Sequence, residues 1–330
     1  MEIKDIIKES LFLDQDLPVI DPIIQIQNKT IAYPQNFICI NGMPKSFKTT
    51  FAFFFIQSAL QQKEVFSIKV NLAIDEKIIL IDTEQSLYDF TRQIKNLKSA
   101  LEVKKMPKNF SAYLFRKYEP QQIIKSIYEL IQKEKPKIII IDNLTELVIN
   151  PNDMIESKAV ITFLKQITAE FNLVVICLLH NAKSTMQSIG NIGSMADRSA
   201  QSSVLVKHDK ETKTTILEPL LMRSDTFFDP ISIYFDQEAK RFLQTDTIIK
   251  DKASSRKFVL MNLTNEDHNN RLRIIFNKVK FIPYAELIEE IKKLYGIGTN
   301  IAKQQVTPYL LGNEFLLSDK GIYQLNLYKK

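Results

Sequence analysis

Residues 42–50 carry the clearest chemical signal in this chain. They read GMPKSFKTT and separate the apolar run FICI from a run whose apolar residues have helical spacing. A glycine at position 42 allows a tight turn, after which backbone N–H groups can converge on a phosphate at the start of the helix. Lys48 would reach the terminal phosphates, and the Thr49 hydroxyl would hold Mg²⁺. We expect ATP to be contacted by Gly42, Met43, Pro44, Lys45, Ser46, Phe47, Lys48, Thr49 and Thr50.

This loop departs from the pattern G-x-x-x-x-G-K-[ST] at Phe47, which stands where the second glycine belongs. A side chain is tolerable there if the residue has helical backbone angles and its ring points away from the phosphates. We hypothesise that Lys45 adds compensating positive charge, so that Lys45→Ala would weaken ATP binding. The alternative is a chance strand, loop and helix that contains a lysine, and the groups described next argue against it.

Three further polar groups follow apolar runs later in the chain. Asp142 ends the run IIIID and could hold the water shell of Mg²⁺. Glu84 follows KIILID and could polarise the water that attacks the γ-phosphate, although it could also be an exposed turn residue. Asp82, just before it, would support Glu84. His180 ends VVICLLH and could sense the γ-phosphate, but a hydrogen-bonded turn residue is an equal alternative.

The elements that must position these groups follow a regular rhythm, because short apolar runs alternate with amphipathic stretches. Runs such as KIIIID are apolar at every position, which is typical of parallel strands covered by helices on both faces. The rhythm predicts an α/β fold, a doubly wound and mainly parallel sheet, over residues 36–245. Four later runs, beginning with SSVLVKHD, are expected to add antiparallel strands to one edge. The polar groups above would then meet at the carboxyl edge of the sheet.

The rest of the chain divides into three further parts. Residues 1–35 are expected to form an N-terminal segment that packs on the main domain, and the polar residues 246–265 to form a linker. Residues 266–330 read as helix (269–279), short strand, helix, helix and hairpin, which predicts a small winged-helix domain.

The third helix of this small domain would face DNA, presenting polar residues that include Lys303 and Gln304. From Lys250 onward the chain has 14 Lys and Arg against 8 Asp and Glu, whereas residues 1–249 have 30 of each kind. The whole surplus of +6 therefore lies in this part, which favours a polyanion such as DNA as a partner. Winged helices also bind proteins, and that alternative remains open.

The composition excludes several other classes of protein. Hydrophobic residues make up 45% and charged residues 25% of the 330 residues, and no apolar run reaches the ~18–20 residues of a membrane span. The first residues include acidic ones where a signal peptide would be basic, so a cytoplasmic protein without membrane contact is expected. Cys39 and Cys177 lie in apolar runs, which favours burial over a disulfide. The spacing of the cysteines and histidines matches no zinc site, so Mg²⁺ carried by the nucleotide is the expected metal.

Taken in order, the segments GMPKSFKTT, LIDTEQS, IIIIDNLTEL, VICLLHNAKS and GSMADRSAQ resemble the RecA-like ATPase core, in particular hexameric helicases of the RepA/DnaB type. The resemblance covers residues 30–245. It implies that Glu84 is the catalytic base, Asp142 the Walker B aspartate and His180 the γ-phosphate sensor. It also implies that Arg223 is an arginine finger inserted into a neighbouring subunit, and hence a homo-oligomer, with a hexamer as the candidate form.

The same resemblance implies that the Gly/Ser-rich residues 184–200 form a mobile loop that touches single-stranded DNA. Gly190 and Gly193 would make the loop flexible, and Lys183 and Arg198 would contact phosphates. The segment has no aromatic residue for stacking, so a flexible connector without a ligand is the alternative.

The function implied by this resemblance is a DNA helicase or translocase of a mobile element or replication system. The chain departs from these helicases at Leu221, where they usually carry a second cation. Together with Phe47, this departure supports an alternative, an ATP-gated DNA-binding or loading protein with weak or no hydrolysis. A regulator whose winged helix is the working part is a further alternative.

Overall fold

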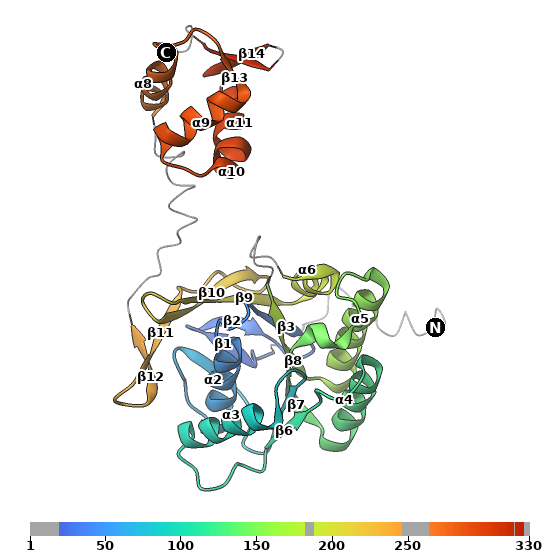
Figure 1. The fold of residues 1–330 in the computed structure, drawn as a ribbon. Helices are drawn as coiled ribbons and strands as arrows, with labels where there is room; N and C mark the ends of the chain where they lie inside the picture. The colour runs from blue at the N-terminus through green and yellow to red at the C-terminus, as the bar shows by residue number, and fades with distance from the viewer. Residues whose placement is uncertain (1–19, 182–187, 246–263, 320, 327–330) are drawn as a thin grey trace, which may run out of the picture. The chain divides into compact units, whose positions relative to one another are not determined.

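The computed structural model describes residues 20–181, 188–245, 264–319 and 321–326, and the chain forms two compact units, Met1–Ile248 and Ile249–Lys330 (Figure 1). The larger unit is built on a nine-stranded sheet of order β12-β11-β10-β9-β3-β8-β7-β5-β6. Neighbouring strands from β9 to β6 are parallel. These strands are β3 (Phe37–Gly42), β5 (Lys77–Asp82), β6 (Phe110–Leu114), β7 (Pro136–Asp142), β8 (Val174–His180) and β9 (Ser202–Asp209).

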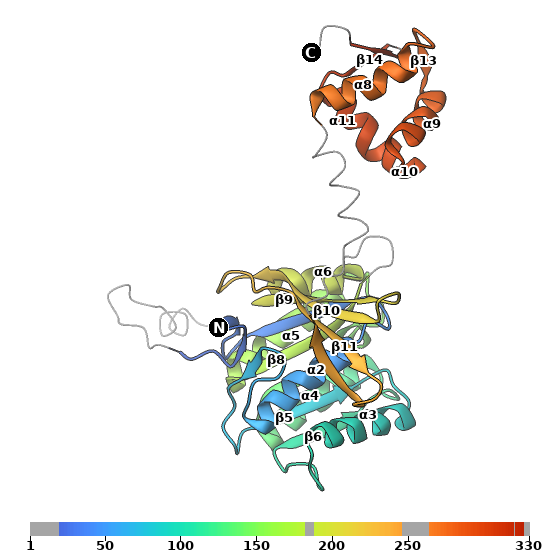
Figure 2. The same ribbon diagram turned by 90° about the vertical axis from the view of Figure 1, so that its left-hand side faces the viewer.

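Helices cover both faces of this sheet (Figures 1 and 2), so the predicted doubly wound α/β class is confirmed. Two helices contribute to the core on one face, and three contribute to the core on the other. The first two are α2 (Lys48–Gln61) and α3 (Leu87–Ala100), and the other three are α4 (Pro120–Glu134), α5 (Met154–Phe171) and α6 (Gly190–Ser199).

The side chains of β3 show how one strand serves both cores. Ile38 and Ile40 belong to the core under α2, whereas Phe37 and Cys39 belong to the opposite core. This division follows from the pleat, which points successive side chains to opposite faces of the sheet. Because both faces are covered, every residue of β3 is buried, which explains the continuous apolar run in the sequence. Cys39 and Cys177 are both buried and carry free thiols.

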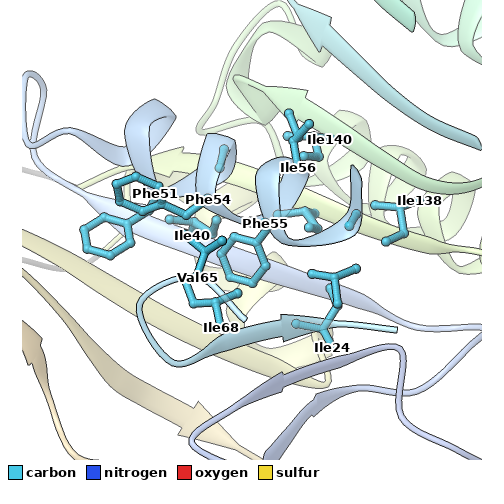
Figure 3. Close-up of a cluster of buried hydrophobic side chains, with 14 of the residues drawn as sticks. Ile24, Ile40, Phe51, Phe54, Phe55, Ile56, Val65, Ile68, Ile138 and Ile140 are labelled. Atoms are coloured by element: carbon cyan, nitrogen blue, oxygen red, sulfur yellow. The ribbon is translucent and has the colours of Figure 1, made fainter. Parts of the chain in front are cut away.

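Figure 3 shows the core under α2, where phenylalanines of the helix lie against isoleucines of the sheet. A small antiparallel sheet of order β2-β1-β4 also contributes to this core. Its strands are β1 (Ile24–Ile26), β2 (Lys29–Ala32) and β4 (Ile68–Val70). The described part of the predicted N-terminal segment therefore packs on the main domain, and residues 1–19 lie outside the described residues.

The strands that extend the sheet correct one prediction. β10 (Thr214–Met222), β11 (Ile231–Asp236) and β12 (Arg241–Thr245) are antiparallel, as expected. The preceding run SSVLVKHD, by contrast, forms β9, which pairs with β3 in parallel. Since β8 and β9 flank β3 on opposite sides, the chain crosses over β3 through α6, and such a crossover produces a parallel strand.

The predicted mobile loop at residues 184–200 is wrong in its second half, because residues 190–199 form α6. The two glycines serve this helix. Gly190 begins it with a φ of +69°, and Gly193 packs so closely on Ser188 that a Cβ would approach the serine Cβ to 2.5 Å. Ile192 and Ala196 are buried in the core, and their burial fixes the helix against the sheet.

The smaller unit contains the elements in the order predicted from the sequence, with its own apolar core. Its first helix begins four residues earlier than predicted, because Thr264 accepts a hydrogen bond from the Asp267 amide and caps it. The third helix runs through Thr299–Gly312 and includes a π-helical segment, Ala302–Val306. The elements are α8 (Asn265–Phe276), β13 (Ile282–Pro283), α9 (Tyr284–Tyr295), α10 (Thr299–Ile301), α11 (Thr307–Gly312), β14 (Leu316–Asp319) and β15 (Ile322–Leu325). The three strands form a sheet of order β13-β15-β14.

Over the described ranges of both units, no helix combines the length and apolar character needed to cross a membrane.

Candidate nucleotide-binding site

The polar groups selected from the sequence gather at the carboxyl edge of four adjacent strands, β3, β8, β7 and β5. These strands end at Gly42, His180, Asp142 and Asp82, respectively. Because the strands are parallel, their ends lie side by side even though the residues are far apart in the sequence. The loop after β3 leads directly into α2, so a helix N-terminus faces the same edge.

The start of α2 lacks a capping group of its own. Its N-cap residue, Phe47, makes no side-chain capping bond, and the first turn contains no acidic residue. In contrast, Ser86 caps α3 and Asp153 caps α5 through bonds to backbone N–H groups. Among the residues that the structure describes, no side chain therefore accepts from the first N–H groups of α2, and an anion such as a phosphate can fill this role.

Two further observations show that the loop fits a phosphate. The hydroxyl of Ser46 is buried, with the residue 3% exposed, and it has no hydrogen-bond partner among the described residues. Gly42 is tightly packed, since a Cβ there would lie 2.5 Å from Ser46 Oγ and 2.6 Å from the Val206 carbonyl oxygen. A phosphate can therefore satisfy the buried Ser46 hydroxyl, at a position of the loop where only a glycine fits without a clash.

Replacing Gly42 with alanine is expected to destabilise the larger unit by about 1–3 kcal/mol, because the Val206 carbonyl belongs to β9 and cannot easily move. Nucleotide binding should fall with it, since the new methyl group would press on Ser46 and on the side chain of Lys48. Urea unfolding and calorimetric titration with ATP measure the two effects. Gly298→Ala is the matched control, because Gly298 has a φ of −79° and nothing lies within 4 Å of its added Cβ. Equal effects of the two substitutions would contradict this account.

Lys48 is buried at the centre of the loop. Its Nζ donates to the carbonyl oxygens of Gly42 at 2.9 Å and Met43 at 3.1 Å, and contacts His180 Nδ1 at 3.0 Å. Burial lowers the pKa of Lys48 to about 8, and the nearby carboxylates of Asp142 and Glu84 offset only part of this effect. An anion placed in the loop would therefore stabilise the charged lysine.

Thr49 and Asp142 supply two oxygen atoms next to each other. The Thr49 hydroxyl donates to Asp142 Oδ2 at 2.6 Å. Burial raises the pKa of Asp142 to about 7, and the hydrogen bond from Thr49 opposes this rise. Hydroxyl and carboxylate oxygens suit Mg²⁺, which in such sites takes its other ligands from phosphates and water. Both residues thus fit the predicted metal-binding role.

The raised pKa of Asp142 predicts how the stability of the ligand-free protein depends on pH. The folded-state pKa of about 7 lies above the ordinary value of 3.8, so between these values the folded state holds a proton that the unfolded state releases. The stabilisation is complete below about pH 4 and is lost as pH rises through about 7, with a slope of up to ~1.4 kcal/mol per pH unit. Urea unfolding of wild type and Asp142→Asn, without Mg²⁺ and nucleotide, should show a flatter pH dependence in the variant. Parallel curves would contradict this assignment.

Glu84 is held by two donors. Asn143 Nδ2 donates to Glu84 Oε1 at 2.9 Å, and His180 Nε2 lies 3.1 Å from the same oxygen. Since the Lys48 ammonium can only donate, Nδ1 of His180 accepts and Nε2 carries the proton that reaches Glu84. The hydrogen bond from His180 is the main cause that lowers the pKa of Glu84. Lys48, His180 and Glu84 therefore form a continuous chain of hydrogen bonds across the site.

Two supporting residues surround Glu84. Asp82 Oδ1 accepts hydrogen bonds from the backbone N–H groups of Glu84 and Gln85, which shapes the turn that carries Glu84. Asn143 did not emerge from the sequence as a site residue. The signal that could have found it is its place directly after Asp142, at the end of a strand that borders the site.

Phe47 does not have the helical backbone angles under which a side chain would be easily tolerated at this position. Its φ of 71° and ψ of 27° lie in the left-handed region, which is where a glycine would normally serve. A non-glycine residue there costs about 1–2 kcal/mol. The ring is exposed and lies against His208 instead of packing in the core. The loop thus bears an aromatic side chain at a backbone conformation that favours glycine.

The other predicted loop residues differ in exposure. Pro44 and Lys45 are exposed, whereas Met43 and Thr50 are half-buried.

The predicted DNA-contact and interface residues are placed as follows. Arg198 is exposed on α6 and Arg223 follows β10, where its guanidinium donates to the Arg198 carbonyl oxygen. Lys303 and Gln304 are exposed on the third helix of the smaller unit. Lys183 lies outside the described residues.

Comparisons with known proteins add a structural likeness. A scan against protein-family models and a search of curated proteins returned no match. Among solved structures, the chain is similar to the KaiC-like protein PH0186 from the hyperthermophilic archaeon Pyrococcus horikoshii OT3. The two are 15% identical, with a TM-score of 0.46, and the likeness covers 64% of this chain and 90% of the other.

Proposed function

We propose that this chain is a RecA-like P-loop ATPase that acts on DNA, as a helicase or translocase of a mobile element or replication system. The observation that carries the proposal is the convergence of Lys48, Thr49, Asp142, Glu84 and His180 at one sheet edge, around an uncapped helix N-terminus. Each residue has the chemistry that phosphoryl transfer to water requires, namely a cation, two metal ligands, a base and a contact to the γ-phosphate.

Within this proposal each side chain has a defined task. When bound, ATP would supply the scissile phosphoanhydride bond, and Mg²⁺ would neutralise the negative charge that develops on it. Lys48 would exchange its contacts with the loop carbonyls and with His180 Nδ1 for phosphate oxygens, which frees His180 from the lysine. Glu84, held by Asn143 and His180, accepts a proton from the attacking water. His180 thereby links the state of Lys48 to the position of Glu84.

The DNA part of the proposal is supported by the smaller unit and by the sequence resemblance. The order helix, strand, helix, helix, strand, strand is that of a winged helix, and the third helix carries exposed Lys303 and Gln304. The chain's surplus of positive charge also lies in this part of the sequence. Exposed Arg198 offers a further cation on the larger unit.

Steady-state ATP hydrolysis by the full chain, with and without single-stranded DNA, tests the proposal. We expect hydrolysis that DNA stimulates and that Lys48→Ala removes. ATP binding without turnover, together with ATP-dependent DNA binding, would favour the alternative of an ATP-gated DNA-binding or loading protein. Absence of ATP binding would refute both.

Arg223→Ala tests the proposed assembly into a ring. We expect this variant to bind ATP normally, while its hydrolysis per chain no longer rises with protein concentration, because a finger acts only on a neighbouring subunit. Specific activity measured over a range of protein concentrations reports this effect. Arg241→Ala, which removes another exposed arginine, is the matched control. If the specific activity of Arg223→Ala depends on protein concentration as in wild type, Arg223 is not a finger. Its role would then be the hydrogen bond to the Arg198 carbonyl oxygen.

A further inference from the structure

Phe47 and His208 form an exposed aromatic corner beside the phosphate loop. Their ring centroids lie 4.7 Å apart and their planes meet at 59°, so the two rings form adjoining walls. Phe47 is 42% exposed, so its ring can be reached by a ligand. His208 is half-buried on β9, with its Nδ1 2.9 Å from the Thr215 hydroxyl, and this contact fixes the ring.

The strand order determines which end of a nucleotide this corner can meet. β8, β7 and β5 lie on one side of β3 and bring His180, Asp142 and Glu84 to the site, whereas β9 lies on the other side. The phosphate that is cleaved must lie near Glu84. In the proposed pose the α-phosphate, ribose and base extend away from β5, toward β9.

Strand β9 extends alongside the start of the phosphate loop. Val206 pairs with Gly42, the last residue of β3, so His208 lies two residues beyond the start of the loop. Phe47 extends from the loop to meet it. Both walls of the corner therefore lie on the side of the loop to which the nucleoside extends.

We propose that the aromatic corner binds the purine base of the nucleotide by stacking, a role that rests on the proposed function of the loop. Phe47 offers an apolar ring face, and His208 offers a second face at an angle to it. Burial is the main cause that lowers the pKa of His208, so its ring is neutral at neutral pH and suits a base better than a phosphate. The backbone of Phe47 has the left-handed angles that a glycine adopts easily, and its ring lies in the corner.

Calorimetric titration of the full chain with Mg²⁺-ATP and with Mg²⁺-tripolyphosphate tests the corner. Tripolyphosphate carries the phosphates without ribose or base. We expect wild type to bind ATP more tightly than tripolyphosphate. Phe47→Gly should lower ATP affinity about tenfold, the loss typical of one stacked base, and leave tripolyphosphate affinity unchanged or higher.

His208→Ala gives a second test that leaves the backbone of the phosphate loop intact. It should also lower the affinity for ATP and spare that for tripolyphosphate, and thermal unfolding of both variants checks that they fold. Equal binding of the two ligands by wild type, or equal losses of both in the variants, would overturn the stacking role and leave the phosphate site standing. Binding of neither ligand by wild type would overturn the proposed function as well.

Discussion

Replacing Glu84 with glutamine is expected to lower the rate of ATP hydrolysis by about 10²- to 10⁴-fold, the usual effect of losing a general base. ATP affinity should stay within a few-fold of wild type, because the amide has the same shape and its oxygen can still accept the bond from Asn143 Nδ2. Single-turnover hydrolysis and equilibrium ATP binding measure the two quantities separately.

Glu146 provides the control for this substitution. It lies on the short 3₁₀ helix Leu144–Leu147 that follows β7, and its pKa is raised by burial and by the nearby charge of Glu84. A raised pKa is the property expected of a general base, so Glu146 is the rival to exclude. We expect Glu146→Gln to retain hydrolysis. Loss of turnover in Glu146→Gln, with turnover kept in Glu84→Gln, would transfer the role of base to Glu146.

The positions of Glu84, Asp142 and His180 could be predicted from the sequence because each follows a strand that is apolar throughout. Such runs specify buried parallel strands, and the carboxyl ends of parallel strands must share one edge. The convergence of these groups on Lys48 follows from this rule alone. The hydrogen bonds between them do not, because side-chain partners depend on tertiary distances that no local pattern contains.

Other features required the structure for identifiable reasons. Residues 190–199 are rich in Gly, Ser and Asn, which usually favour a loop, but burial of Ile192 and Ala196 holds them in a helix. The direction of β9 depends on whether it pairs with β8 as a hairpin or crosses over to β3, and its own residues do not contain that choice.

The conformation of Phe47 also could not be predicted from the sequence. Its backbone is left-handed, and a phenylalanine in the sequence gives no indication of that conformation. The consequence is chemical, since the ring stands at the edge of the site beside His208 and is not directed into the core. The departure from the motif thus places an aromatic ring beside the phosphate loop.

Replacing Lys48 with alanine is expected to weaken ATP binding by about 2–4 kcal/mol, roughly 30- to 1,000-fold, because phosphate charge would lose its buried partner. Without nucleotide the variant should fold normally, since burial already lowers the pKa of Lys48 to about 8 and so disfavours the charge that is removed. Equilibrium binding of ATP and thermal unfolding measure these effects.

Lys45→Ala is the matched control for Lys48→Ala. Lys45 lies in the same loop but is exposed, and no hydrogen bond or ion pair joins it to the described residues. Water screens an exposed charge, so its removal should weaken ATP binding by at most about 1 kcal/mol. The difference between the two lysines then measures the contribution of burial to phosphate binding. Equal losses would mean that the loop attracts the nucleotide only through its overall charge, and the buried contacts of Lys48 would not be the basis of binding.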